Sequence, residues 1–77
     1  MILNTTTCLI KVRLKGASRR RFFVVPRGAF RTLLAAGPYI ISLDAEGECR
    51  IGVDPPLKAI LKKKTRYFLR LPPKDPE

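Results

Sequence analysis

The sequence contains no histidine and no tryptophan among its 77 residues, and only two cysteines. Without imidazole, the chain lacks the residue on which many metal sites, catalytic triads and acid–base pairs depend. Cys8 and Cys49 are too few and too far apart for a zinc site, which needs four ligands in paired spacings. We expect two small buried hydrophobic residues in a reducing compartment, and a single disulfide is the alternative.

Acidic residues are also scarce, because the chain has only six aspartates and glutamates. Three of them, Asp44, Glu46 and Glu48, fall within one turn that contains a glycine, where solvated charge is the expected arrangement. Asp54 is the only other acid before the proline-rich end of the chain. The sequence shows no nucleophile–base pair and no glycine-rich phosphate loop with a lysine. We therefore predict a protein that is not an enzyme and that has no catalytic residues, metal or cofactor.

Long apolar runs are missing as well, since none approaches the ~18 residues that a membrane-spanning helix requires. The first residues do not show the basic and apolar regions of a signal peptide. The overall apolar content of 45% is nevertheless that of a folding chain. For this length we predict one domain over residues 1–71, followed by an extended proline-rich tail over residues 72–77.

Positive charge is the strongest signal. Sixteen lysines and arginines against six acids give a formal charge of +10, and the isoelectric point is near 10.5. This exceeds the net charge of roughly 2–8 that keeps a small domain soluble. The excess indicates a polyanionic or acidic partner, which is a nucleic acid, an anionic membrane or an acidic protein.

The alternation of apolar and polar residues predicts several strands. Residues 8–15 place apolar side chains on one face and Lys11, Arg13 and Lys15 on the other. Residues 19–25 end with apolar side chains on both faces, which favours a central strand covered by a helix.

Further strands are predicted in the second half of the chain. Residues 39–43 and 49–53 predict a β-hairpin with a longer loop. Residues 65–71 alternate again and form either a last strand or an extended arm.

Two short helices complete the expected fold. Phe30, Leu33 and Leu34 have helical spacing, and Gly37 stands where a C-terminal cap belongs, so we predict a helix from about Arg27 to Ala36.

A second helix is expected after Pro55 and Pro56, with an apolar stripe at Leu57, Ile60 and Leu61 and with lysines 62–64 in its last turn. The predicted fold class is therefore α+β, with a small and largely antiparallel sheet of three to five strands and one or two short helices.

Two basic and aromatic clusters are the candidate binding residues. The first combines the cationic strand face with the three arginines that precede Phe22, and the second follows the predicted second helix. The candidate residues are Lys11, Arg13, Lys15, Arg19, Arg20, Arg21, Lys62, Lys63, Lys64, Arg66, Tyr67, Phe68 and Arg70. Cations beside apolar anchors suit docking into an acidic protein assembly. Cations interleaved with aromatic rings also suit RNA, so a small nucleic-acid-binding module is the alternative.

Residues 8–43 resemble the small linker domain of phycobilisomes, the CpcD-like family. The resemblance lies in a strand of apolar and basic residues, a basic turn, a strand ending in valine and proline, an amphipathic helix, a glycine and an isoleucine-containing strand. In this sequence the corresponding segments are Leu9–Leu14, Arg20–Pro26, Phe30–Ala36 and Gly37–Leu43.

The resemblance implies a non-catalytic linker of the photosynthetic light-harvesting apparatus. Such proteins sit in the central hole of acidic phycobiliprotein rings, which a basic chain complements in charge. By position, the cations that face the ring are Lys11, Arg13 and residues 19–21. The location implied is the cytoplasm or the stroma, at the surface of the thylakoid membrane.

Overall fold

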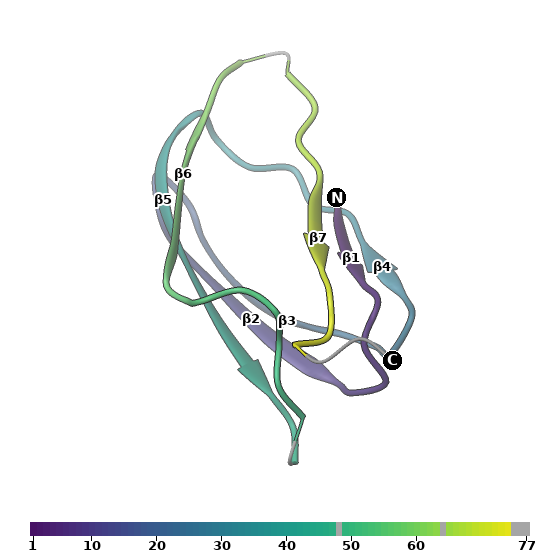
Figure 1. Ribbon diagram of the computed structural model, residues 1–77. Helices are drawn as coiled ribbons and strands as arrows, with labels where there is room; N and C mark the ends of the chain where they lie inside the picture. Colours follow the sequence, from purple (N-terminus) through teal and green to yellow (C-terminus); the bar gives the residue numbers. More distant parts are fainter. Residues whose placement is uncertain (48, 64, 75–77) are drawn as a thin grey trace.

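A computed structural model describes residues 1–47, 49–63 and 65–74, and these form seven β-strands in two sheets (Figure 1). In chain order the strands are β1 (Ile2–Asn4), β2 (Ile10–Gly16), β3 (Arg19–Val24), β4 (Ala29–Phe30), β5 (Gly37–Ala45), β6 (Leu57–Leu61) and β7 (Leu69–Leu71). The larger sheet has the order β3-β2-β5-β6 and the smaller one β4-β1-β7.

The prediction of an α+β fold is wrong, because the described residues contain strands and no helix. The protein is a small all-β domain. It follows that no helix long and apolar enough to cross a membrane occurs within the described residues.

Strand β2, at the centre of the larger sheet, forms where the alternation of apolar and polar residues predicts a strand. β2 pairs antiparallel with β3 on one side and with β5 on the other. Ile10, Val12 and Leu14 are buried on its inner face, while Arg13 and Lys15 are exposed on the opposite face. The sheet therefore has one dry face and one charged face, as a half-buried antiparallel sheet should.

β3 is an edge strand, whereas the sequence indicated a central strand under a helix. The inner side of its second half is apolar, with Val24 buried and Phe22 half-buried. Phe22 stacks on Phe30, with ring centroids 3.9 Å apart. Phe23 points to the other face and is 50% exposed. The run of apolar residues therefore reflects one half-buried ring and one exposed ring.

The segment predicted as the first helix is mostly irregular. Ala29 and Phe30 form β4, which pairs antiparallel with β1, and Arg27 adopts a positive φ of 57° that ends any helical path. Leu33, a member of the expected apolar stripe, is 93% exposed. A helix of so few residues is marginal without tertiary packing, and here pairing with β1 takes Ala29 and Phe30 into a strand instead.

The segment predicted as the second helix is strand β6. Leu57, Ala59 and Leu61 are half-buried, whereas Lys58 and Ile60 are exposed. The residues thus alternate with the period of a strand, and the helical spacing of Leu57, Ile60 and Leu61 was coincidental. Lysines 62 and 63 consequently end no helix, and Lys64 lies outside the described residues.

The predicted hairpin partner of β5 is also different. β5 pairs with β6 rather than with residues 49–53, which contribute only an isolated antiparallel bridge between Ile51 and Pro73. The amide of Lys74 donates to the carbonyl oxygen of Arg50 at 3.1 Å. The start of the proline-rich tail therefore lies against the chain that follows Cys49.

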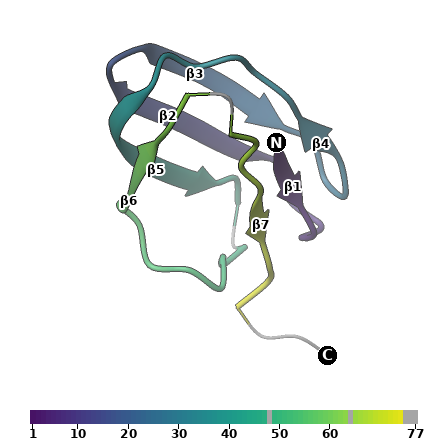
Figure 2. The same cartoon turned by 90° about the horizontal axis from the view of Figure 1, so that it is seen from above.

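The smaller sheet pairs the first strand with the last one. β1 pairs parallel with β7, so Ile2 lies opposite Leu69 and Asn4 lies opposite Leu71. In the view from above, β4, β1 and β7 lie on one side of the molecule and the larger sheet on the other (Figure 2). The buried apolar core contains side chains from both sheets, which are Ile2, Ile10, Val12, Leu14, Val24, Tyr39, Leu43 and Leu71.

Candidate functional site

The outer face of the larger sheet gathers most of the cations of the first predicted cluster. Residues directly opposite each other in an antiparallel pair share a face, so the register shows which side chains are neighbours. Lys15 lies between Arg19 on β3 and Ile40 on β5, and Ile40 in turn lies opposite Lys58 on β6. This first row therefore crosses all four strands and carries three positive charges.

Two more rows follow along the strands. Arg13 lies opposite Arg21 on one side and Ser42 on the other. Lys11 lies between Phe23 and Asp44. We call the three rows the basic face, and its residues are Lys11, Arg13, Lys15, Arg19, Arg21, Phe23, Ile40, Ser42, Asp44 and Lys58.

The basic face is poorly neutralised by the protein itself. It carries six cations, and Asp44 is its one acidic member. The guanidinium of Arg13 lies 3.6 Å from the carboxylate of Asp44, with the two side chains 55% and 64% exposed. An exposed pair of this kind contributes between zero and about 1 kcal/mol. Cross-strand neighbours of like charge, Arg13 with Arg21 and Lys15 with Arg19, are destabilising by a comparable amount.

Two shallow hollows lie on this side of the sheet. The first has a volume of about 550 Å³ and is lined by residues of β2, β3 and β5, which are Arg13, Leu14, Lys15, Arg19, Arg20, Arg21 and Ser42. The side chain of Arg20 belongs to the opposite face of β3, but this residue is exposed and also lines the first hollow.

The second hollow lies over β5 and β6, with a volume of about 790 Å³, and has a more apolar lining. Pro38, Ile40 and Ile60 contribute apolar surface, and the cations around them are Lys15, Arg19 and Lys58. Apolar side chains beside cations are thus exposed together at this end of the basic face.

The described residues of the second predicted cluster lie outside the strands of the larger sheet. Lys62, Lys63, Arg66, Tyr67 and Phe68 belong to the connection between β6 and β7. The hydroxyl of Tyr67 accepts a hydrogen bond of 2.9 Å from the amide of Lys62, and the Tyr67 carbonyl accepts one of 2.8 Å from the N-terminal ammonium group. Tyr67 therefore helps to hold this connection against the N-terminus.

Arg70 is exposed on β7 and belongs to the smaller sheet, opposite Leu3. It lies outside the basic face. Lys64, the remaining residue of the second cluster, is outside the described part of the chain.

Sequence reasoning missed Lys58 and Ile40 as members of the candidate site. The signal for Lys58 was its position between the apolar residues Leu57 and Ala59, which is typical of a strand with one buried face. The prediction of a helix over this segment obscured that signal. Ile40 alternates with the inward-facing Tyr39 and Ile41, and this pattern was visible in the sequence. That the two residues meet could not be inferred, because residues 49–53 were expected to pair with β5.

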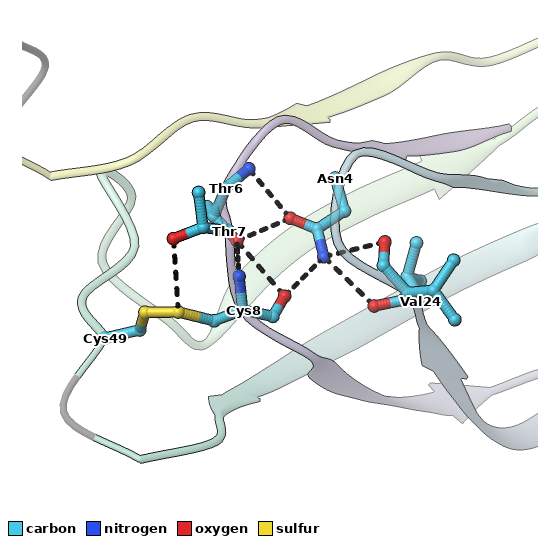
Figure 3. The surroundings of a disulfide bond; sticks show 7 residues. Asn4, Thr6, Thr7, Cys8, Val24 and Cys49 are labelled. Carbon is cyan, nitrogen blue, oxygen red and sulfur yellow. Dashed lines mark hydrogen bonds between the residues drawn. A yellow bond between two sulfur atoms is a disulfide. The ribbon is translucent and has the colours of Figure 1, made fainter.

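Asn4 is a further residue that sequence reasoning missed, and its role is structural. It is completely buried, and its amide nitrogen donates to the carbonyl oxygens of Cys8, Val24 and Val25 at 2.7, 3.0 and 3.1 Å. Its oxygen accepts from the amide and the hydroxyl of Thr6 (Figure 3). Asn4 therefore connects β1, the turn before β2 and the end of β3.

The two cysteines are joined in a disulfide beside this network (Figure 3). Their Cα atoms are 6.2 Å apart, within the range that a disulfide spans. The expectation of two buried free thiols is therefore wrong for this structure. The reason is that the chain after β5 returns toward the start of β2, a long-range approach that residue spacing does not reveal.

The described residues show no group of three or more histidine, cysteine, aspartate or glutamate side chains that could hold a metal ion. Asp44 lies on the basic face, and Glu46 and Asp54 are exposed in connecting segments. Glu48 falls outside the described residues.

Comparisons with protein-family models, with curated proteins and with solved structures find no match. The function proposed below therefore rests on the geometry of the basic face.

Proposed function

We propose that this protein is a non-catalytic adaptor that docks on an acidic protein partner through its basic face. The observation that carries the proposal is the cross-strand stacking of like charges, in which Arg13 faces Arg21 and Lys15 faces Arg19 on an open sheet surface. This arrangement costs stability in the free protein and yields attraction only when negative charge lies over it. A surface that served folding alone would be more stable if positive and negative side chains lay opposite each other.

The apolar groups beside the cations favour a protein partner. Ile40 and Ile60 are 43% and 71% exposed, and Pro38 is exposed next to them. Aliphatic anchors beside charges are typical of protein interfaces, where apolar burial supplies affinity and charge supplies orientation. Single-stranded nucleic acid is recognised instead by rings on which several bases stack, and Phe23 is the one ring on the basic face.

Two double variants of equal charge test the proposal. Arg13→Ser with Arg21→Ser removes two cations from the basic face, and Arg31→Ser with Arg50→Ser removes two exposed cations from segments outside the larger sheet. The probe is a copolymer of glutamate and leucine, and binding is measured by calorimetry at about 0.1 M salt. We expect about tenfold weaker binding for the first variant and less than about twofold for the second.

Equal losses in the two variants would show that net charge, and not the basic face, attracts the probe. The same titrations with polyuridylate compare the two partner classes. Tighter binding of polyuridylate than of the copolymer, with a steep and log-linear salt dependence, would replace the adaptor proposal with a nucleic-acid-binding function.

A linker in phycobiliprotein rings is a narrower form of this proposal. It is supported by the resemblance of residues 8–43 and by the positive charge, while the segment expected to form the amphipathic helix of that family, Phe30–Ala36, contains no helix here. Capture from a nuclease-treated source lysate, read across the ultraviolet and visible, tests it. A coloured acidic protein that elutes with the chain supports the linker, and a colourless eluate counts against it.

A further inference from the structure

The two edges of the larger sheet differ in how they are protected against pairing with another chain. Edge strands expose unpaired backbone groups, and proteins usually guard them with charges, prolines or bulges. β3 carries three consecutive arginines, all exposed. β6 reads Leu-Lys-Ala-Ile-Leu, with one charge and no proline within the strand. β6 is therefore the less protected edge, and it follows β5 at the end of the strand order.

The register identifies which backbone groups β6 offers. Opposite residues in an antiparallel pair alternate between hydrogen-bonded and non-hydrogen-bonded pairs. Pro38 lies opposite Ile60 and has no N–H group to donate, so this pair belongs to the non-hydrogen-bonded class. The same class includes Lys58, two residues away. The N–H and C=O groups of Lys58 and Ile60 therefore point away from β5, toward the open edge.

The side chains around this edge select the chemistry of a ligand strand. Lys58 and Ile60 both lie on the outer side of β6, while Leu57, Ala59 and Leu61 are half-buried on the inner side. The hollow over β5 and β6 adds Lys15 and Arg19 to the charge of Lys58. A strand next to β6 would thus meet cations on one face and aliphatic groups on the other.

We propose that an extended acidic segment of the partner adds to the larger sheet as a fifth strand beside β6. Its carboxylates face Lys58 and the neighbouring cations, and its alternate apolar side chains face Leu57, Ala59 and Leu61. Main-chain hydrogen bonds to Lys58 and Ile60 provide affinity, as in other cases of strand addition. The inference rests on the proposed adaptor function and names how the partner is held. A second copy of this chain is disfavoured as the occupant because each copy carries a charge of +10.

The test uses a capped heptapeptide of alternating glutamate and valine, and a control peptide that is N-methylated at each glutamate. The larger sheet is antiparallel throughout, and in an antiparallel pair the residues opposite Lys58 and Ile60 point their N–H groups at β6. Glutamates at these positions lose that donor on methylation, while charge and side chains stay the same. In the protein, Ile60→Pro removes the N–H at the open edge without disturbing the pairing to β5, because residue 60 faces Pro38. Ile60→Ala is the matched control, since it removes the side chain and keeps the N–H.

We expect Ile60→Pro and peptide methylation each to weaken binding by about tenfold or more, and Ile60→Ala to weaken it by about threefold or less. Equal affinities of Ile60→Pro and Ile60→Ala for the unmethylated peptide would overturn strand addition, whereas the adaptor function is tested separately by Arg13 and Arg21. If the Ile60→Pro variant does not fold, the proposal is tested by comparing the affinities of the methylated and unmethylated peptides for the unmodified protein. One further result would overturn the proposal: the free protein forms a dimer, and Ile60→Pro abolishes that dimer. A second copy of the chain would then occupy the edge of β6.

Discussion

At the scale of single residues, Asn4 shows how one buried amide can position three segments. Its nitrogen supplies donors to three carbonyl groups and its oxygen accepts from Thr6, and every buried polar side-chain atom in the described part of the chain has a partner. Removing one partner from a buried network leaves the others unsatisfied and costs about 1–3 kcal/mol per group. The stability of the junction between β1, β2 and β3 therefore depends on the chemistry of this side chain as well as on its size.

Substitutions at Asn4 test this dependence. Asn4→Ala should lower the free energy of unfolding by about 2 kcal/mol, because backbone carbonyls lose their donor. Asn4→Asp has nearly the same shape but places acceptors against carbonyl oxygens, so it should cost more than Asn4→Ala. Urea denaturation measures both, and Thr7→Ala at an exposed neighbouring position should change stability by less than about 0.5 kcal/mol. An Asp variant as stable as the original protein would contradict the role of the amide donor.

At the scale of elements, the like charges of the basic face lower the stability of the free protein and favour the binding of an acidic partner. β2 and β3 pair with like charges opposite each other, and the exposed pair of Arg13 and Asp44 offsets little of the repulsion. Binding sites often retain such a cost, because substitutions that relieve it also weaken function. The larger sheet should therefore become more stable when one of these cations is removed.

Arg21→Thr tests this cost, because threonine suits a strand and removes one like-charge pair. At about 10 mM salt we expect the variant to be more stable than the original protein by about 0.5 kcal/mol, and the gain should shrink at about 0.5 M salt as charges are screened. Thermal denaturation at the two salt concentrations measures the effect. Arg31→Thr removes the same charge outside the sheet and should show a smaller gain. A destabilised Arg21→Thr at low salt would indicate that the arginine supports the fold.

At the scale of the whole molecule, a thin core is supplemented by a covalent link. Among the residues that the structure describes, the core contains eight buried apolar side chains, and a chain this short buries only about 60% of the surface of its unfolded state. The disulfide joins residues separated by 41 positions and thereby restricts the unfolded chain. For a loop of this length the chain-entropy model gives a stabilisation of about 4 kcal/mol, and measured values are commonly about 2–4 kcal/mol.

Replacing both Cys8 and Cys49 with alanine should lower the free energy of unfolding by about 2–4 kcal/mol. A thiol reductant should shift the urea midpoint of the original protein toward that of the double variant and should leave the double variant unchanged. If reduction does not change the midpoint of the original protein, the link contributes nothing to stability.

Local patterns in the sequence were sufficient to determine β2, β3 and the central part of β5. β2 alternates apolar with polar side chains, and a period of two has one structural solution when one face is buried. β3 and the central part of β5 are instead rich in aromatic and β-branched residues, which favour strands. The same alternation places Lys11, Arg13 and Lys15 together on a single face. These features depend on neighbours along the chain, which the sequence displays directly.

The tertiary structure alone decided the state of the short apolar segments and their partners. Residues 27–36 and 57–61 carry apolar residues at helical spacing, yet pairing with β1 takes Ala29 and Phe30 into a strand, residues 31–36 are irregular, and pairing with β5 makes residues 57–61 a strand. The parallel pairing of β1 with β7 and the meeting of Cys8 with Cys49 join residues far apart in the sequence. Such contacts depend on which edges remain free once the central strands have paired. The sequence thus determined a charged face on two strands, and the fold decided that β6 completes it and leaves its own edge open.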